Sequence, residues 1–162
     1  MRTCRHPIAD LLPHAPPMVL LDSVLGWDKD RLVAAVAIRP GIPFFQPGRG
    51  VPAHVGIEYM AQACGAYAGL EALESGERVR IGFLLGTRRY VANVDWFEED
   101  RQLAVSVVEV FRDGSMGVFD CTILSEGHEL ATAQLNVYQP DENGLSNNES
   151  EKESVGEPPK DG

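Results

Sequence analysis

The chain has 162 residues, of which 44% are hydrophobic and 23% charged, and this composition is typical of one soluble globular domain with its own core. Its formal net charge is −10. This balance argues against binding to nucleic acid or to an anionic membrane surface, because both partners require a basic face.

The first predicted elements are two strands. The lead "MRTCRHPIADLLPHAPP" lacks the apolar segment and cleavage site of a signal peptide. Two apolar runs then follow, Met18–Trp27 and Arg31–Pro40, and the polar "DKD" between them predicts a hairpin. A loop rich in glycine and proline, "GIPFFQPGRGVP", comes next.

One long helix is predicted after this loop. Pro52 suits a first helical turn, the apolar pattern continues to Ser75, and Gly76 is a typical stop. The helix is rich in Ala and Gly and holds His, Glu and Gln, so we do not expect it to span a membrane. Its composition instead predicts burial within the protein.

Four more strands are predicted after the helix: residues 79–94, 102–112, 116–126 and 128–140. Turn sequences "DGS" and "EGH" separate the last three. Six strands and one dominant helix favour an α+β fold, in which a mostly antiparallel sheet wraps around the helix.

The last segment differs in composition from the body. Residues 141–162 contain seven acidic side chains, two lysines and no aromatic residue. Such a segment cannot bury enough apolar surface to offset its ordering entropy. The sequence therefore predicts one domain over residues 1–140 and a disordered acidic tail over residues 141–162.

The helix carries a polar stripe. His54, Glu58 and Gln62 are each four residues apart and share one tilted face. A carboxyl group in an apolar setting is suited to general acid catalysis, and the first-turn amides near Ala53–Val55 are suited to hold a developing oxyanion. The alternative is a solvated helix face, but such a face usually carries several charges, whereas this one carries a single charge. We therefore favour a functional carboxylate.

The cysteines indicate neither a metal nor a redox site. Cys4, Cys64 and Cys121 are widely spaced, and two of them lie in apolar runs. We interpret them as free thiols in a reducing, cytoplasmic compartment. The sequence shows no phosphate-binding glycine loop or metal-ligand cluster, and no cofactor is predicted.

Three stretches carry a family resemblance: "LLPHAPPMVLLDSV", "PFFQPGRGVPAHVGIEYMAQA" and "GFLLGTRRY". They resemble the hot-dog 3-hydroxyacyl-acyl-carrier-protein dehydratases, and in particular a divergent branch associated with aryl-polyene and related fatty-acid-like biosynthesis. The resemblance covers roughly residues 8–139. It implies a hot-dog fold, a homodimer with sheets joined edge to edge, and an acyl-carrier-protein thioester as substrate.

The resemblance also implies roles for residues of the helix. In the family, a His and an acidic residue from two subunits face each other; the His takes the proton at C2, and the acid helps the 3-hydroxyl leave as water. Glu58 aligns with the acid and Gln62 with a glutamine that follows it. Ala53 aligns with the position whose amide binds the thioester carbonyl, and Val55 lies in the same turn.

The chain departs from the family pattern at the catalytic His. The family places this His fourteen residues before the acid, where this chain has Phe44 and a loop without histidine. His14, in the "LPH" motif, and His54, one turn from Glu58, are the two candidates for the base. A structural role remains open for both.

Three further polar residues have open interpretations. Arg88 and Arg89 are candidates to bind the phosphopantetheine phosphate or an acidic carrier protein, and a solvated strand end is the alternative. For Asp22 we favour a structural partner of an arginine or of turn amides over a second carboxylate in the pocket.

These observations favour a 3-hydroxyacyl-acyl-carrier-protein dehydratase. One rival is a thioesterase on the same fold, in which Glu58 activates water or attacks the thioester carbonyl. The other is a non-catalytic subunit that binds an acyl chain or supports an active relative in a heteromer. The acyl length and the choice between carrier protein and coenzyme A stay open.

Overall fold

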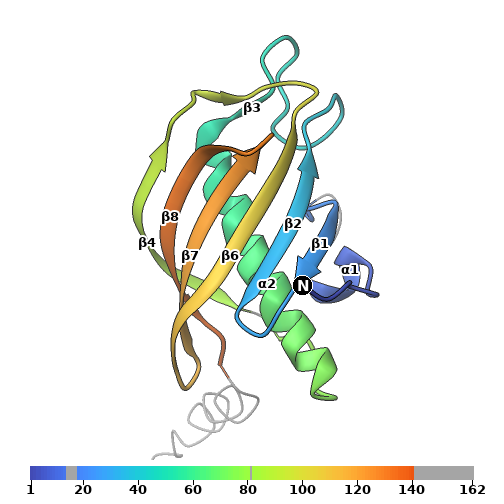
Figure 1. Ribbon diagram of the computed structural model, residues 1–162, viewed down its shortest axis with the longest axis vertical. Coiled ribbons are helices and arrows are strands. Elements are labelled where there is room, and N and C mark those ends of the chain that lie inside the picture. The colour runs from blue at the N-terminus through green and yellow to red at the C-terminus, as the bar shows by residue number, and fades with distance from the viewer. Residues whose placement is uncertain (14–17, 81, 141–162) are drawn as a thin grey trace, which may run out of the picture.

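A computed structural model describes residues 1–13, 18–80 and 82–140 (Figure 1). The elements in chain order are α1 (Ile8–Leu11), β1 (Ser23–Trp27), β2 (Arg31–Ala37), β3 (Val51–Pro52), the 3-10 turn η1 (Ala53–Val55), α2 (Gly56–Glu74), β4 (Phe83–Ala92), β5 (Trp96–Phe97), β6 (Gln102–Asp113), β7 (Met116–Ser125) and β8 (His128–Tyr138).

Six antiparallel strands form one curved sheet in the order β1-β2-β6-β7-β8-β4. The strands β6, β7 and β8 follow one another through tight turns, in which Gly114 and Gly127 have positive φ angles of 58° and 79°. Only β4 is out of sequence order, because it pairs with β8 at the far edge. The sheet therefore ends at β1 on one side and at β4 on the other.

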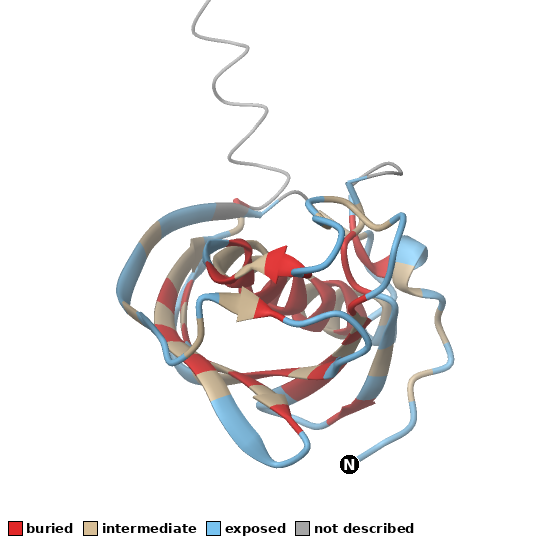
Figure 2. Cartoon of the chain, turned by 90° about the horizontal axis from the view of Figure 1, so that it is seen from above, coloured by how far each residue is buried: buried red, intermediate tan, exposed pale blue. Residues whose placement is uncertain are grey.

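The sheet wraps around α2, and the core lies between them. Viewed from above, buried residues line the concave face of the sheet and the surface of α2 that faces it (Figure 2). Strand β7 shows the expected alternation, since Phe119, Cys121 and Ile123 are buried and their neighbours are less so. The helix contributes Tyr59, Met60 and other buried residues along most of its length.

Two glycines let other segments approach α2 closely. A side chain at Gly56 would collide with the Tyr90 hydroxyl, and a side chain at Gly69 would collide with the Leu11 carbonyl oxygen. The small residues of the helix thus match the close packing that its composition predicts.

The predicted architecture is found: six strands form one sheet around one long helix. The largest boundary differences are at three strands, because β1 begins at Ser23 rather than Met18, β2 ends at Ala37 rather than Pro40, and β4 begins at Phe83 rather than Val79. The two-residue pair of β3 and β5 and the short helix α1 were not predicted. The predicted acidic tail lies outside the described residues.

Candidate functional site

Glu58 and Gln62 lie together on one face of α2. The Glu58 side chain is half-buried and lines a cavity, and Gln62 is 1% exposed. The Gln62 amide nitrogen lies 3.5 Å from the Glu58 carboxylate, within hydrogen-bond reach. Glu58 and Gln62 therefore do not form a fully solvated helix face.

Gln62 also fastens a distant segment to the helix. Its side-chain oxygen accepts a hydrogen bond from the Leu20 amide at 2.8 Å, and its nitrogen donates to the Met18 carbonyl at 2.7 Å. These bonds explain why β1 begins later than predicted, since the peptide groups at Met18 and Leu20 bind the helix rather than a strand. They also fix the amide that faces Glu58.

The start of the helix is held by backbone and side-chain hydrogen bonds. The Ala53 amide donates to the Asp95 carbonyl at 3.0 Å, and the Ala53 carbonyl accepts from the Tyr90 hydroxyl. In this structure the Ala53 amide is therefore engaged with a backbone acceptor, and the expectation that it binds the thioester carbonyl stays a prediction. The amides of His54 and Val55 follow in the first turn, where helix geometry supplies no carbonyl partner.

The two candidate bases are placed differently. His54 is exposed on η1, and among the described residues it makes no hydrogen bond to Glu58. His14 lies outside the described residues. Its neighbour Pro13 lines the same cavity as Glu58, and Met18, at the next described position, is bound by Gln62.

Asp22 and Arg88 lie away from the cavity lining. Asp22 accepts a hydrogen bond from the Ala37 amide at 2.7 Å and pairs with Arg39 at 3.4 Å, so it has the structural role that the sequence favoured. Arg88 and Arg89 are exposed on the edge strand β4, and Arg89 has a positive φ of 54°. Neither arginine is among the residues that line the cavity.

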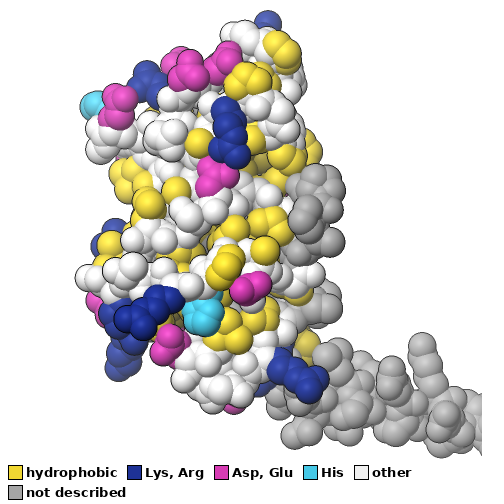
Figure 3. All heavy atoms as spheres, turned by 90° about the vertical axis from the view of Figure 1, so that its right-hand side faces the viewer, with side chains coloured by type: hydrophobic (Ala, Val, Ile, Leu, Met, Phe, Trp, Pro, Cys, Tyr) yellow, Lys and Arg dark blue, Asp and Glu magenta, His cyan; other side chains and the backbone are white. Residues whose placement is uncertain are grey.

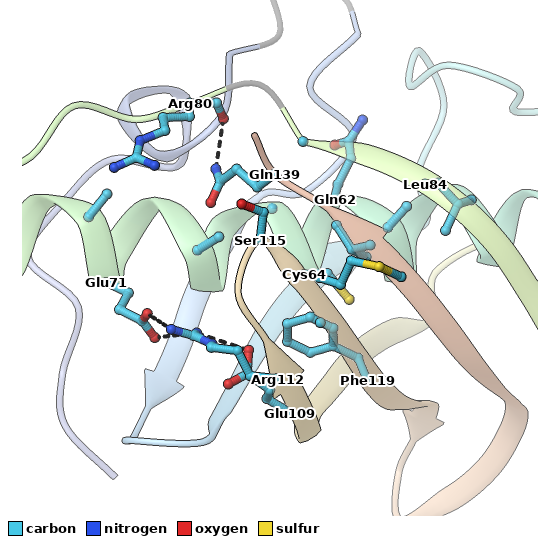
Figure 4. A pocket seen from close by; sticks show the side chains of 18 of the residues that line it. Gln62, Cys64, Glu71, Arg80, Leu84, Glu109, Arg112, Ser115, Phe119 and Gln139 are labelled. Atoms are coloured by element: carbon cyan, nitrogen blue, oxygen red, sulfur yellow. Dashed lines mark hydrogen bonds and ion pairs between the residues drawn. The ribbon is translucent and has the colours of Figure 1, made fainter. Parts of the chain in front are cut away.

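The cavity has a volume of about 580 Å³ and runs along α2 between the helix and the sheet. Glu58, Ala61 and Gln62 line it near the start of the helix, and Ala68 and Glu71 line it further on. The opposite wall comes from β4, β7 and β8, with Leu84 and Phe119 among its side chains (Figure 4). Val137 of β8 also lines it. An acyl chain needs such an elongated, partly apolar space.

A charged cluster lies at the far part of the cavity, and the sequence did not reveal it. Arg112 donates to both Glu71 oxygens and, at 2.9 Å, to Glu109 (Figure 4). The hydrogen bonds from Arg112 lower the pKa of Glu71. Because Arg112 and Glu71 are 41 residues apart, no local sequence pattern could pair them.

The cysteines confirm the prediction of free thiols. Cys64 and Cys121 are buried, with their sulfur atoms 3.9 Å apart, and Cys4 is partly buried. Burial raises the pKa of the Cys64 thiol, so this sulfur is a poor nucleophile.

Within the described residues, no three His, Cys, Asp or Glu side chains come together as a metal site. No helix in this part of the chain is long and apolar enough to cross a membrane. On the face shown in Figure 3, acidic and basic side chains are interspersed.

Comparison with known proteins gives a consistent family. The model of the ApeP-like family, described as ApeP dehydratase, matches residues 6–148. The 3-hydroxyacyl-[acyl-carrier-protein] dehydratase FabZ of Proteus mirabilis is 34% identical over 113 residues, which are 60% of this chain and 75% of that protein. FabZ of Anaeromyxobacter dehalogenans is 28% identical over 76% of this chain and 86% of that protein.

The solved structures agree with the sequence matches. The dehydratase heterocomplex ApeI:P from Xenorhabdus doucetiae has a chain that is 31% identical, with a TM-score of 0.82 over 89% of this chain and 97% of that one. A hypothetical thioesterase with coenzyme A from Streptococcus pneumoniae, at 11% identity and a TM-score of 0.59 over 73% of this chain and 84% of that one, shares the fold alone. The chain has the predicted hot-dog fold and belongs to the ApeP-like dehydratase family.

Proposed function

We propose that this protein dehydrates 3-hydroxyacyl thioesters on acyl carrier protein to 2-enoyl thioesters. The observation that carries the proposal is Glu58, a half-buried carboxyl group that lines an elongated cavity beside the fixed amide of Gln62. The names of the dehydratases that the chain resembles support the same reaction.

In this reaction the C2–H and C3–O bonds break and a C2=C3 double bond forms. The Glu58 carboxyl group gives a proton to the 3-hydroxyl, which leaves as water, and a base takes the proton from C2. Negative charge develops on the thioester oxygen as the C2 proton leaves. We propose the first-turn amides of His54 and Val55 as alternatives to the Ala53 amide for holding that oxygen.

For the base we favour His14 over His54. Both flanks of the segment that holds His14 meet the site, since Pro13 lines the cavity and Met18 binds Gln62. His54 is exposed, and within the described residues it makes no hydrogen bond to Glu58.

We propose that two hot-dog chains assemble through the open edge of β4. The sequence resemblance implies a second copy of this chain as the partner, and the heterocomplex ApeI:P supports a related dehydratase as an alternative partner. The second chain would bring its own residues to the site of the first. Three free thiols are consistent with our assignment of the reaction to the cytoplasm.

The test is mass spectrometry of a carrier-bound 3-hydroxyacyl thioester after incubation with the purified protein. We expect a product lighter by one water, lost in Glu58→Gln and in His14→Ala but kept in His54→Ala. The matched control is Glu74→Gln, which removes an exposed carboxylate at the end of the same helix.

Three outcomes would contradict parts of this proposal. Release of the whole acyl group would make the protein a thioesterase. Loss of activity in His54→Ala alone would move the base to His54. An unchanged substrate, even with the related dehydratase supplied, would favour a non-catalytic subunit.

A further inference from the structure

The face of α2 that lines the cavity changes character along its length. Beyond Gln62 it presents small side chains to the cavity, at Cys64, Gly65 and Ala68. Phe119 and Val137 lie on the opposing wall. This half of the cavity is therefore a groove suited to an unbranched apolar chain.

Further along the helix, the groove is lined by charged side chains instead of apolar ones. Glu71 continues the helix face, and Arg112 and Glu109 reach it from β6. The Glu109 side chain is only 13% exposed. A methyl group placed against this cluster would strip water from charged groups and return no hydrogen bond, which is unfavourable.

Arg112 has the capacity to bind a further oxygen. A guanidinium group carries five N–H donors, and the three hydrogen bonds to Glu71 and Glu109 use three of them. Two donors thus have no partner among the described residues. Gly117 also lines the cavity beside the cluster, and a Cβ there would lie 3.1 Å from the Phe119 ring and 3.5 Å from a Glu109 oxygen, so a larger residue would crowd this part of the groove.

The helix sets the distance from the reacting carbons to the cluster. Ten residues separate Glu58 from Ala68 and thirteen separate it from Glu71, which correspond to about 15 and 20 Å at about 1.5 Å per residue. An extended chain advances by about 1.2 Å per bond. A chain whose third carbon lies at Glu58 therefore reaches the cluster after about 12 to 16 further bonds.

We propose that the Glu71–Arg112–Glu109 cluster lines the far part of the acyl-binding groove and selects chains by their distal end, favouring a hydrogen-bonding oxygen over a methyl group. The inference rests on the proposed function, because it places the acyl chain in the cavity beside Glu58. It identifies the substrate class as acyl thioesters with an oxygen-bearing distal end.

The experiment measures binding, separately from catalysis. The probes are saturated phosphopantetheine thioesters without a 3-hydroxyl, with chains of about six or about sixteen carbons that end in a methyl or a hydroxyl group. For the full-length wild type we expect the long hydroxyl-ended chain to bind about tenfold more tightly than its methyl-ended counterpart, as one hydrogen bond to a charged group implies. The two short probes should bind equally.

Two variants test which residues distinguish the long hydroxyl-ended probe from the long methyl-ended one. Arg112→Met should reduce the preference between the long probes to about onefold. Ala68→Leu fills the groove before the cluster, leaves the cluster itself intact, and should weaken both long probes more than the short ones. The matched control is Arg101→Met, because Arg101 also bridges two carboxylates, Glu98 and Glu126, at a side-chain exposure of 43% against 45% for Arg112.

The outcomes separate this inference from the reaction. Equal binding of the long probes to the wild type, or the same loss of preference in Arg101→Met, would overturn the inference. Dehydration of a short 3-hydroxyacyl substrate, assayed in parallel, would leave the proposed function standing in that case. A clear preference without any dehydration would sustain the groove assignment and contradict the reaction.

Discussion

At the scale of single residues, Gln62 has two tasks that sequence reasoning treated as one. It lies beside Glu58, and it also satisfies one amide and one carbonyl of the segment from Met18 to Leu20. The two backbone hydrogen bonds hold the Gln62 amide in place, with its nitrogen 3.5 Å from the Glu58 carboxylate. The surroundings of Glu58 therefore depend on a segment more than forty residues away.

We predict that Gln62→Met lowers the free energy of unfolding by about 2 kcal/mol, because it leaves the buried Leu20 amide without a partner and removes the bond to the Met18 carbonyl. Urea unfolding measures this change. The control is Gln134→Met, since the Gln134 side chain bonds to the exposed Asp120 and to no other side chain that the structure describes, and its loss should cost less than about 0.5 kcal/mol. Equal effects of the two substitutions would mean that the Gln62 contacts do not hold the segment.

Tyr90 makes the start of the helix sensitive to alkaline pH. Burial raises the pKa of Tyr90 from 10.0 to about 12, and its hydroxyl donates to the Ala53 carbonyl. A raised folded-state pKa means that the contribution to stability is complete below pH 10.0 and is lost as pH rises through about 12.

We therefore expect Tyr90→Phe to unfold with a weaker pH dependence than the wild type between about pH 10 and 12, by on the order of 1 kcal/mol after allowance for partial exposure. Urea midpoints at several pH values across this range measure the difference. Tyr138→Phe, which alters an exposed side chain, is the comparison. A slope in Tyr90→Phe that matches the wild type would exclude Tyr90 as a source of alkaline sensitivity.

At the scale of elements, α2 is a helix whose glycines have different tasks. Gly69 allows the Leu11 backbone to lie against the helix, so an added methyl group would meet a carbonyl oxygen. Among the described residues, a Cβ at Gly65 would meet only the end of the Leu12 side chain, at 3.2 Å. A flexible side chain can move aside, whereas a backbone group held by α1 cannot.

The two glycines give opposite predictions for the same chemical change. Gly69→Ala should lower the free energy of unfolding by about 1–3 kcal/mol through overpacking. Gly65→Ala should be neutral or raise it by up to about 1 kcal/mol, because alanine favours the helix. Thermal unfolding of both variants checks the pair, and a stabilised Gly69→Ala would show that α1 does not pack tightly on α2.

The elements could be predicted from sequence where their signals were local. Pro52 and Gly76 bracket the long helix, and "DGS" and "EGH" mark two turns of the sheet. The polar stripe also identified Glu58 and Gln62. These signals depend on neighbouring residues, which is why a single sequence carries them.

The features that the sequence did not reveal depend on contacts between distant residues. The Ala53 amide looked available because nothing nearby in the sequence reveals Asp95 as its acceptor. The pairing of Arg112 with Glu71 joins a strand to the helix across 41 residues. β3 and β5 have two residues each and pair only because the fold brings them together.

At the scale of the whole molecule, the two edges of the sheet differ. The β1 edge is partly covered, because Arg2 exchanges two backbone hydrogen bonds with Trp27 at 2.7 and 3.1 Å. The β4 edge is the last strand of the sheet and carries the exposed apolar side chains Leu85 and Val91. An uncovered, apolar edge is a ready surface for strand pairing with another chain.

We predict that Leu85→Lys combined with Val91→Lys converts the assembly to single chains, because lysines repel each other across a paired edge. Light scattering measures the mass. Leu25→Lys at the β1 edge is the matched control, since Leu25 is 58% exposed and Leu85 is 55% exposed. An unchanged mass in the β4 variant, or dissociation in the β1 variant, would place the interface elsewhere.

Dissociation should also reduce dehydration if two chains complete each site. Leu85 and Val91 do not line the cavity, although Leu85 is next to Leu84, which does. A loss of activity that accompanies the loss of mass would therefore be due to the missing partner chain. Raising the protein concentration should then restore both together by mass action. Full activity in a single chain would instead mean that His14 and Glu58 act within one subunit, and that the edge contributes only stability.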